Sequence, residues 1–371
     1  MKILLLGDYS NCHRTLATGL RSMGHDVTLI SDGSAWMQCE RDFDLTRKPG
    51  KLGGLQLYWK MMGPMHRYLR GYDIVALHDI NFVRLKPHRL RQLFDRLLRD
   101  NGSVFLTAMS TDIAYLDMVS APDGPLRYSE WFVGDKPSRW YSFNPGLWEE
   151  WHQPALMDYQ RYALDHINGA VSVLYEYELG MRRWLGPDRS AYGGIPIDVG
   201  LFQQVKLPTN PEQVKLFLGR DRNRMPLKGT DMLEDAVKEV ISRHPDNARL
   251  TIVENRPFNE FIGLMRDSHI VLDQIYSYTP ATTALMAMAY GLNVISGGEP
   301  EYYNYIGEKD LRPIINAPID MQGLIDAIED VVTHPEHIAT RGEMSRKFVE
   351  RHNACDVVAD RFVKFWEKHS S

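Results

Sequence analysis

A cluster of cations follows a short apolar stretch in the second half of the chain. The segment 217–229 has the sequence Phe-Leu-Gly-Arg-Asp-Arg-Asn-Arg-Met-Pro-Leu-Lys-Gly. Its basic residues are Arg220, Arg222, Arg224 and Lys228. Guanidinium and ammonium groups at the end of a strand suit a diphosphate, which needs several donors and neutralisation of its charge. If a group leaves with that diphosphate, fixed cations stabilise the transition state more than the ground state. We predict a diphosphate site here, with Gly219 letting the backbone turn tightly against the ligand; a solvated basic loop is the alternative.

A second segment, 273–291, joins hydroxyl residues to a helix-forming run. It has the sequence Asp-Gln-Ile-Tyr-Ser-Tyr-Thr-Pro-Ala-Thr-Thr-Ala-Leu-Met-Ala-Met-Ala-Tyr-Gly. Ser277, Thr279 and Pro280 indicate a helix start. The free amide groups of such a start carry roughly half a positive charge and bind phosphate. We assign the first turn to a ligand and the rest of the helix to the core, with Gly291 as its stop.

Polar residues also follow apolar runs near the N-terminus. Gly7 permits the close approach of a substrate, and His13 either contacts an acceptor or a donor phosphate or is structural. His78 and Asp112 end two further runs, and either could take a proton from an acceptor hydroxyl. The chain has no GxGxxG motif, which argues against a nicotinamide-dependent dehydrogenase.

The elements that must position these residues alternate between short apolar runs and amphipathic stretches, which is typical of βα units on a parallel sheet. The first series predicts strands at 2–6, 27–30, 73–77, 104–107 and 170–174, and helices at 14–23, 86–100 and 176–185. The second series predicts strands at 214–218, 249–253, 270–273 and 293–296, and helices at 230–243, 259–266, 282–290, 320–333 and 356–368.

A break at Gly193–Asp198, extended by Pro208, Asn210 and Pro211, divides the two series. We predict an α/β protein of two Rossmann-like domains facing each other across a cleft, with ligands at the carboxyl ends of the strands. The first domain spans about 1–195 and the second about 196–355, while the helix at 356–371 packs back on the first. An insertion at about 118–160 carries Trp131, Trp140, Trp148 and Trp151, and is either a lid or binding loop or a small satellite core.

Composition excludes several classes of protein. The chain has 371 residues, of which 44% are apolar and 25% charged, so two separate cores are feasible. A net charge of −5 gives no reason to expect binding to nucleic acid. Three scattered cysteines form no disulfide framework or zinc motif, and no apolar run approaches the length of a membrane span. We expect a cytoplasmic protein, with the basic helix at 86–100 either solvated or docked on an anionic membrane surface.

Segments 214–305 resemble the family 4 retaining glycosyltransferases, which have the GT-B architecture. The Gly-Arg…Lys-Gly block and the later Ala-Met-Ala-Tyr-Gly-Leu-Asn-Val-Ile run carry the resemblance. Leu272–Tyr278 and Gly297–Glu301 are similar to a bacterial subgroup found among polysaccharide-assembly enzymes, and Gly194–Asp198 resembles the family's crossing between domains. The resemblance implies that Arg220 and Lys228 hold the donor diphosphate. It also implies contacts of the segment 278–283 with phosphate and sugar, through Tyr278, Thr279, Thr282 and Thr283.

The sequence departs from the family pattern at two points. The gap between Arg220 and Lys228 is longer than usual, so Arg222 or Arg224 could be the partner of Lys228. The family's two glutamates fall near Tyr278 and Met286, and the second of them normally grips the ribose. Glu254 and Glu301 are therefore candidates to replace it.

We therefore hypothesise transfer of a hexosyl group, with retention, from a UDP- or GDP-linked sugar to a glycan or lipid-linked saccharide. Arg and Lys would supply the charge, so neither a metal nor a cofactor beyond the donor is expected. The alternatives are a GT-B-fold nucleotide-sugar 2-epimerase and a non-catalytic subunit that binds a nucleotide or a partner protein.

Overall fold

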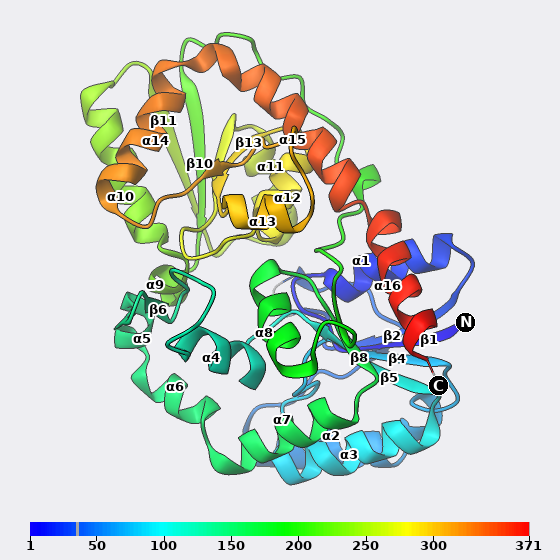
Figure 1. Ribbon diagram of the computed structural model, residues 1–371. Coiled ribbons are helices and arrows are strands. Elements are labelled where there is room, and N and C mark those ends of the chain that lie inside the picture. The colour runs from blue at the N-terminus through cyan, green and yellow to red at the C-terminus, as the bar shows by residue number, and fades with distance from the viewer. Residues whose placement is uncertain (35–36, 371) are drawn as a thin grey trace. The chain divides into compact units, whose positions relative to one another are not determined.

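A computed structural model describes residues 1–34 and 37–370 of the chain, which divides into two compact units (Figure 1). Unit 1 comprises Met1–Pro125, Asn144–Pro196 and the stretch from Cys355 onward. Unit 2 comprises Leu126–Phe143 and Ile197–Ala354. Each unit contains its own parallel sheet.

The sheet of unit 1 has the strand order β3-β2-β1-β4-β5-β8-β9, and every pairing between neighbours is parallel. The strands are β1 (Lys2–Leu6), β2 (Asp26–Ser31), β3 (Phe43–Asp44), β4 (Ile74–Leu77), β5 (Ser103–Ala108), β8 (Gly169–Ser172) and β9 (Ser190–Tyr192). Buried strands rich in Leu, Ile and Val are what a sheet covered on both faces requires.

Helices cover both faces of this sheet because successive strand residues point to opposite sides. Ile3 and Leu5 face α1 and α16, whereas Leu4 and Leu6 face the core formed with α2, α3, α4 and α7. Figure 1 shows α16 lying along α1, and the two helices are in extensive contact. The helices are α1 (Cys12–Ser22), α2 (Gly50–Met62), α3 (Pro87–Asp100), α4 (Ile113–Ser120), α6 (Pro145–Trp151), α7 (Pro154–His166), α8 (Tyr175–Leu185) and α16 (Cys355–His369).

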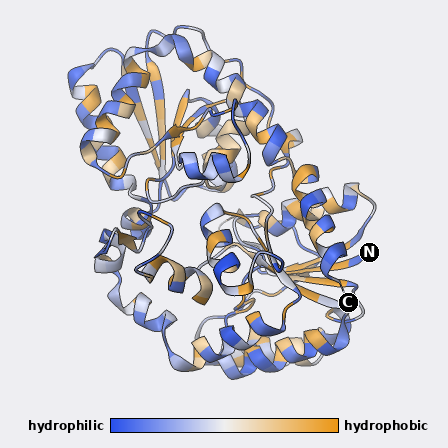
Figure 2. Ribbon diagram, in the orientation of Figure 1, coloured by the Kyte–Doolittle hydropathy of each residue, from blue (hydrophilic) through white to orange (hydrophobic). Residues whose placement is uncertain are grey.

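The sheet of unit 2 has the order β11-β10-β12-β13-β14, again with parallel pairings. Its strands are β10 (Val214–Arg220), β11 (Ala248–Glu254), β12 (Ile270–Leu272), β13 (Asn293–Ser296) and β14 (Ile315–Asn316). Its main helices are α9 (Met225–Lys228), α10 (Thr230–Arg243), α11 (Phe258–Arg266), α12 (Thr282–Ala289), α13 (Pro300–Tyr305), α14 (Met321–Thr333) and α15 (Ile338–His352). Figure 2 shows apolar strands inside both units and hydrophilic outer faces on many helices.

The segment Leu126–Phe143, here called the arm, departs from the expected domain arrangement. We predicted that the whole aromatic insertion belongs to the N-terminal domain, yet the arm groups with unit 2. It contains the antiparallel hairpin of β6 (Phe132–Val133) and β7 (Lys136–Pro137), followed by α5 (Arg139–Phe143). Trp131 is buried against Trp140, with ring centroids 6.4 Å apart, which gives the arm a small core of its own.

Candidate functional site

Strand ends in unit 2 bring the predicted diphosphate residues to one edge of the sheet. Arg220 ends β10 and pairs in register with Glu254, which ends β11, while Asp273 directly follows β12. Parallel strands place their carboxyl ends at a common edge, which is where ligands bind in open α/β sheets. The pattern of apolar runs therefore predicted from the sequence that these residues share one edge of a sheet.

Arg220 is held between two carboxylates. Its guanidinium forms ion pairs with Glu234 of α10 and with Glu254, and only 15% of its side chain is exposed. Arg222 also donates to Glu254, at 2.9 Å, from an exposed position. The hydrogen bond from Arg220 is the main cause that lowers the pKa of Glu254 below its usual value. Arg220 is therefore a fixed and already neutralised cation in this structure, held in place by its pairing with both Glu234 and Glu254.

A neighbouring side chain explains why position 219 is a glycine. A Cβ on Gly219 would lie 2.4 Å from the ring of Phe261, which packs over this part of β10. The predicted reason for the glycine was the close approach of a ligand, whereas the structure supplies an aromatic ring from α11.

Lys228 is a second paired cation at this edge, and its side chain is more exposed than that of Arg220. Its Nζ donates to Asp273 Oδ1 at 3.0 Å, and the side chain of Lys228 remains 30% exposed. Asp273 is nearly fully buried, and its second oxygen accepts a hydrogen bond from Ser296 at 3.1 Å. The backbone carbonyl of Lys228 accepts from the Ile275 amide at 3.0 Å, which fixes α9 against the start of the β12–α12 loop.

At the end of the β12–α12 loop, the first turn of α12 is accessible to a ligand, whereas Tyr278 of the loop is not. Tyr278 and Thr279 are buried, with 1% and 2% of their surface exposed. Helix α12 begins at Thr282, and its N-cap residue Ala281 supplies no side-chain acceptor to the first-turn amides. Thr282 and Thr283 are half-buried. An anion at this end would therefore be held by backbone N–H groups of the first turn, which have no capping side chain.

The arm covers the same loop. The Tyr278 hydroxyl accepts a hydrogen bond from the Arg127 amide at 2.7 Å, and the Tyr128 ring lies against the Tyr278 ring with centroids 4.8 Å apart. The Arg127 guanidinium forms ion pairs with Glu299 and, at 3.0 Å, with Glu301. Tyr278 therefore contacts the arm in the position where we predicted contact with phosphate or sugar.

Glu299 is a buried carboxylate at this edge that was not predicted from the sequence. It directly follows Gly297 and Gly298, and it accepts hydrogen bonds from Tyr128 at 2.7 Å and Asn316 at 2.8 Å besides its pairing with Arg127. We predicted Glu301, two residues on, as a candidate substitute for the ribose-binding glutamate because it follows the end of the strand predicted at 293–296. The sequence signal that could have identified Glu299 was its position after β13, and this signal applies equally to Glu299 and Glu301.

Three buried oxygen atoms at this edge have no hydrogen-bond partner among the described residues: Thr230 Oγ1, Asp231 Oδ1 and Glu301 Oε2. Asp231 and Glu301 each use their other oxygen to bind an arginine of the arm, Arg139 and Arg127 respectively. Buried polar atoms are rarely left without partners, so such atoms mark candidate contacts for a ligand.

His13 in unit 1 is enclosed. Its Nδ1 lies 2.8 Å from the Gly7 carbonyl oxygen and its Nε2 lies 2.9 Å from the Thr107 hydroxyl, with none of the side chain exposed. Burial lowers its pKa to about 3, so the ring is neutral. Both nitrogens serve the protein, and the structural alternative is the one that this geometry favours.

Gly7 also has a local explanation. Its φ is +81°, which is favourable only for glycine, and a Cβ would lie 1.8 Å from His78 Nδ1. His78 therefore occupies the space where we predicted a substrate, and its own Nδ1 lies 3.3 Å from the Leu6 carbonyl oxygen. Burial is the main cause that lowers the pKa of His78.

Asp112 is the N-cap of α4. Its Oδ1 accepts a hydrogen bond from the Tyr115 amide at 2.9 Å, and the side chain is 3% exposed. Burial raises its pKa to about 7, and the nearby Asp79 adds to the shift. A carboxyl group that titrates near neutrality has the pKa required of a general base, although its oxygen caps a helix here.

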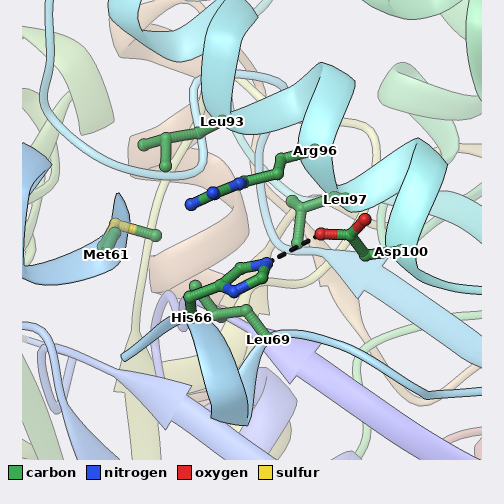
Figure 3. Close-up of a pocket in the computed structure, with 7 residues that line it drawn as sticks. All are labelled: Met61, His66, Leu69, Leu93, Arg96, Leu97 and Asp100. Atoms are coloured by element: carbon green, nitrogen blue, oxygen red, sulfur yellow. Dashed lines mark hydrogen bonds and ion pairs between the residues drawn. The ribbon is translucent and has the colours of Figure 1, made fainter. Parts of the chain in front are cut away.

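Two further features bear on the predictions. Within the residues described, no group of three or more His, Cys, Asp or Glu is arranged to hold a metal ion, and no helix is long and apolar enough to cross a membrane. A pocket in unit 1 lies between α2 and α3, and Figure 3 shows Arg96 and the paired His66 and Asp100 in its wall. None of the predicted site residues lines this pocket.

Solved structures share the fold over nearly the whole chain. Sucrose-phosphate synthase from Thermosynechococcus elongatus has a TM-score of 0.62 at 14% identity, with 99% of both chains covered. HepE from Anabaena, solved with UDP-glucose, has a TM-score of 0.60 at 15% identity and the same coverage. UDP-GlcNAc 2-epimerase from Neisseria meningitidis, bound to UDP-GlcNAc, has a TM-score of 0.51 at 12% identity over 99% of this chain and 100% of that one.

The sequence itself matches no protein-family model, and no curated protein is similar enough to count as a match. At these low identities the similarity concerns the fold. Together with the two parallel sheets, it confirms the predicted α/β class with two Rossmann-like domains: the chain has the GT-B architecture.

Proposed function

We propose that the protein is a glycosyltransferase that moves a hexosyl group from a UDP- or GDP-linked sugar to a glycan or lipid-linked saccharide, with retention. The observation that carries the proposal is the edge of the unit 2 sheet. There Lys228, at the end of α9, pairs with Asp273 at the start of the β12–α12 loop, and the uncapped α12 begins at the other end of that loop. Lys228 and the start of α12 are both donors suited to phosphate oxygens. The solved structures of this fold with UDP-glucose and UDP-GlcNAc support a nucleotide sugar as the ligand.

In this proposal Lys228 and the first-turn amides of α12 stabilise the charge that grows on the leaving diphosphate. The bond between the sugar and the diphosphate breaks, the acceptor oxygen bonds to the same sugar carbon, and the leaving phosphate oxygen accepts the proton of the acceptor hydroxyl. No separate base is then required, and Asp112 keeps its place as a helix cap. Arg220 positions Glu254 and the end of β10 rather than contacting phosphate directly.

Position 286, where the family that the sequence resembles has its ribose-binding glutamate, is a methionine in this chain. We therefore assign ribose recognition to another carboxylate. Glu301 Oε2 is buried without a partner among the described residues, while Glu301 Oε1 pairs with Arg127. A carboxylate oxygen accepts hydrogen bonds from ribose hydroxyls, so Glu301 is the residue that we assign to this contact. The fixed cations supply charge without a metal, and activity in the presence of excess EDTA is the expected result.

The decisive experiment incubates the purified protein with UDP-glucose, UDP-GlcNAc or a GDP-hexose, with and without saccharide acceptors. Transfer predicts release of UDP or GDP only when an acceptor is present, and proton NMR of the product reports whether the anomeric configuration is kept. An inverted product would contradict retention, and no nucleotide release with a broad acceptor panel would contradict transfer.

An epimerase is the second candidate, because the Neisseria 2-epimerase shares the fold over its full length. It predicts a new UDP-sugar epimer from the donor alone. A non-catalytic subunit is the third, because the cations Arg220, Lys228 and Arg127 each already pair with a carboxylate. That candidate predicts that no nucleotide sugar binds in calorimetry.

A further inference from the structure

Helix α2 was not predicted from the sequence, and it is apolar on two opposite sides. Its inner side contributes Leu57 and Met61 to the core of unit 1. Its outer side carries Leu52 and Trp59, seven residues apart and hence on one face of the helix. Leu52 is 74% exposed and Trp59 63% exposed, which places them among the most exposed large apolar side chains of the described residues.

Leu52 and Trp59 lie outside the core that the inner side of α2 joins, so this outer apolar ridge faces solvent. Lys51 and Lys60 flank this ridge, since they lie about 80–100° of helical turn from Leu52 on either side. An apolar ridge bordered by lysines is the pattern of a helix that lies in the plane of a membrane interface, with Trp at the headgroup level.

The charge around α2 is the opposite of the charge of the chain as a whole. Residues 45–72 contain six Lys and Arg and no Asp or Glu, and residues 45–100 contain twelve Lys and Arg against four Asp. The chain as a whole has a net charge of −5. Lys48, Lys51, Arg67 and Arg70 are exposed, and none of them forms an ion pair with another described residue.

Helix α3 continues the same surface. The Tyr58 hydroxyl of α2 donates to Gln92 of α3 at 2.6 Å, and the Arg89 guanidinium lies 5.5 Å from the centre of the Tyr58 ring. Arg96 donates to the Met62 carbonyl oxygen at 2.6 Å, and it lines the small pocket between the two helices (Figure 3). The basic helix identified in the sequence is thus held beside the apolar ridge of α2.

We propose that the outer face of α2, with the basic residues of α2 and α3 around it, docks on an anionic lipid membrane. Leu52 and Trp59 insert among the acyl chains and headgroups, and the exposed Lys48, Lys51 and Arg67 contact acidic headgroups. A second copy of the chain fits this face poorly, because a two-fold contact would bring like charges together. A nucleic acid would use the cations but would leave the Leu52 side chain without a partner.

The test is co-sedimentation of the whole chain with two kinds of vesicle, one of phosphatidylcholine alone and one that also contains 30% phosphatidylglycerol. The proposal predicts binding to the second, anionic kind. We expect binding to the anionic vesicles, weakened by salt, and a roughly tenfold or greater loss of affinity for Leu52→Gln and for Trp59→Gln. Lys48→Glu and Lys51→Glu should each weaken binding about fivefold or more, on anionic vesicles only.

Matched controls are Leu201→Gln and Phe143→Gln, which replace side chains of 64% and 61% exposure elsewhere on the chain. Both controls should keep wild-type affinity for vesicles. Equal losses in the controls, unchanged binding of Leu52→Gln and Trp59→Gln, or no binding of the wild type to either vesicle would overturn the proposal. Two other results would also overturn the proposal, provided that the α2 substitutions abolish them. One is binding of the wild type to duplex or single-stranded nucleic acid, and the other is dimerisation of the wild type in sedimentation velocity. Because vesicle binding is measured without a sugar donor, its outcome is independent of the proposed enzymatic activity.

Discussion

The charged residues at the edge of the unit 2 sheet are held in place by ion pairs. Lys228 neutralises Asp273, which is almost fully buried, and Asp273 in turn takes a hydrogen bond from Ser296. Removing one partner from such a pair leaves a charge in a poorly solvated place, which costs more than the pair itself contributes. A single substitution at this site therefore mixes two effects, one on folding and one on the bound ligand.

We expect Lys228→Ala to lower turnover by roughly two orders of magnitude, as does the loss of other donors that stabilise a leaving group. It should also lower the free energy of unfolding by about 1–3 kcal/mol, because Asp273 loses its cation. The double variant Lys228→Ala with Asp273→Asn should regain stability but not turnover. Steady-state kinetics and urea denaturation measure the two effects. Recovery of turnover in the double variant would show that Lys228 serves only Asp273.

Asp112 provides a prediction on pH. Its pKa is about 7 in the folded protein, against 3.8 for an unperturbed aspartate, so the folded state keeps a proton that the unfolded state has lost between about pH 4 and pH 7. The contribution of Asp112 to the stability of the folded state therefore falls as the pH rises through this range. Asparagine cannot ionise and still caps a helix.

Asp112→Asn should consequently match the wild type near pH 4 and exceed its free energy of unfolding at pH 8, by on the order of a few kcal/mol. Denaturation in urea at pH 4, 6 and 8 measures the difference. A difference that does not change with pH would mean that the buried carboxyl group is not the source. Retained turnover in the same variant would exclude Asp112 as the base.

At the scale of elements, the arm is the structural feature that most affects the candidate site. Its residues Arg127 and Tyr128 contact Tyr278 and Glu299, so the β12–α12 loop and the turn after β13 are both fixed by a segment from the first half of the chain. The contacts include a hydrogen bond from a phenol to a carboxylate that is 9% exposed. Hydrogen bonds to charged groups of this kind are worth more than neutral ones.

We expect Tyr128→Phe to lower the free energy of unfolding by about 1.5–3 kcal/mol, because Glu299 loses a buried donor. Tyr162→Phe is the matched control, since the Tyr162 hydroxyl donates at 2.8 Å to the exposed Asp95 of unit 1. Its cost should stay below about 1 kcal/mol. Thermal and urea denaturation of both variants give the comparison, and equal costs would mean that the arm adds little to unit 2.

At the scale of the whole molecule, the sequence predicted what local patterns encode. The strands Lys2–Leu6 and Asn293–Ser296 and the helix Thr230–Arg243 have the bounds expected from their apolar periodicity. Helix α2 escaped prediction because Gly50, Gly53 and Gly54 weaken its helix propensity and its two apolar sides give no periodic signal. The same property makes it a candidate membrane contact.

The candidate site was predicted only in part, for a related reason. Strand ends located Arg220 and Glu254, because a local pattern of apolar runs marks such ends. Lys228 lies beyond the strand, at the end of α9, and was predicted from the basic cluster that follows β10. The partners of those residues come from distant positions: Arg127 meets Glu299 across 172 residues of sequence. No local pattern encodes such a contact, and a lone histidine such as His13 carries no sign of whether it will be enclosed.

The chain passes between the two units four times, at the ends of the arm, after Pro196 and after Ala354. The sequence that forms unit 2 is consequently discontinuous along the chain. Recombination that exchanged only residues 197–354 with a relative would import a foreign Tyr278 and Glu299 beneath a resident Arg127 and Tyr128. Residues 197–354 should therefore be exchanged rarely between relatives, and the arm should change in step with the loops that it covers.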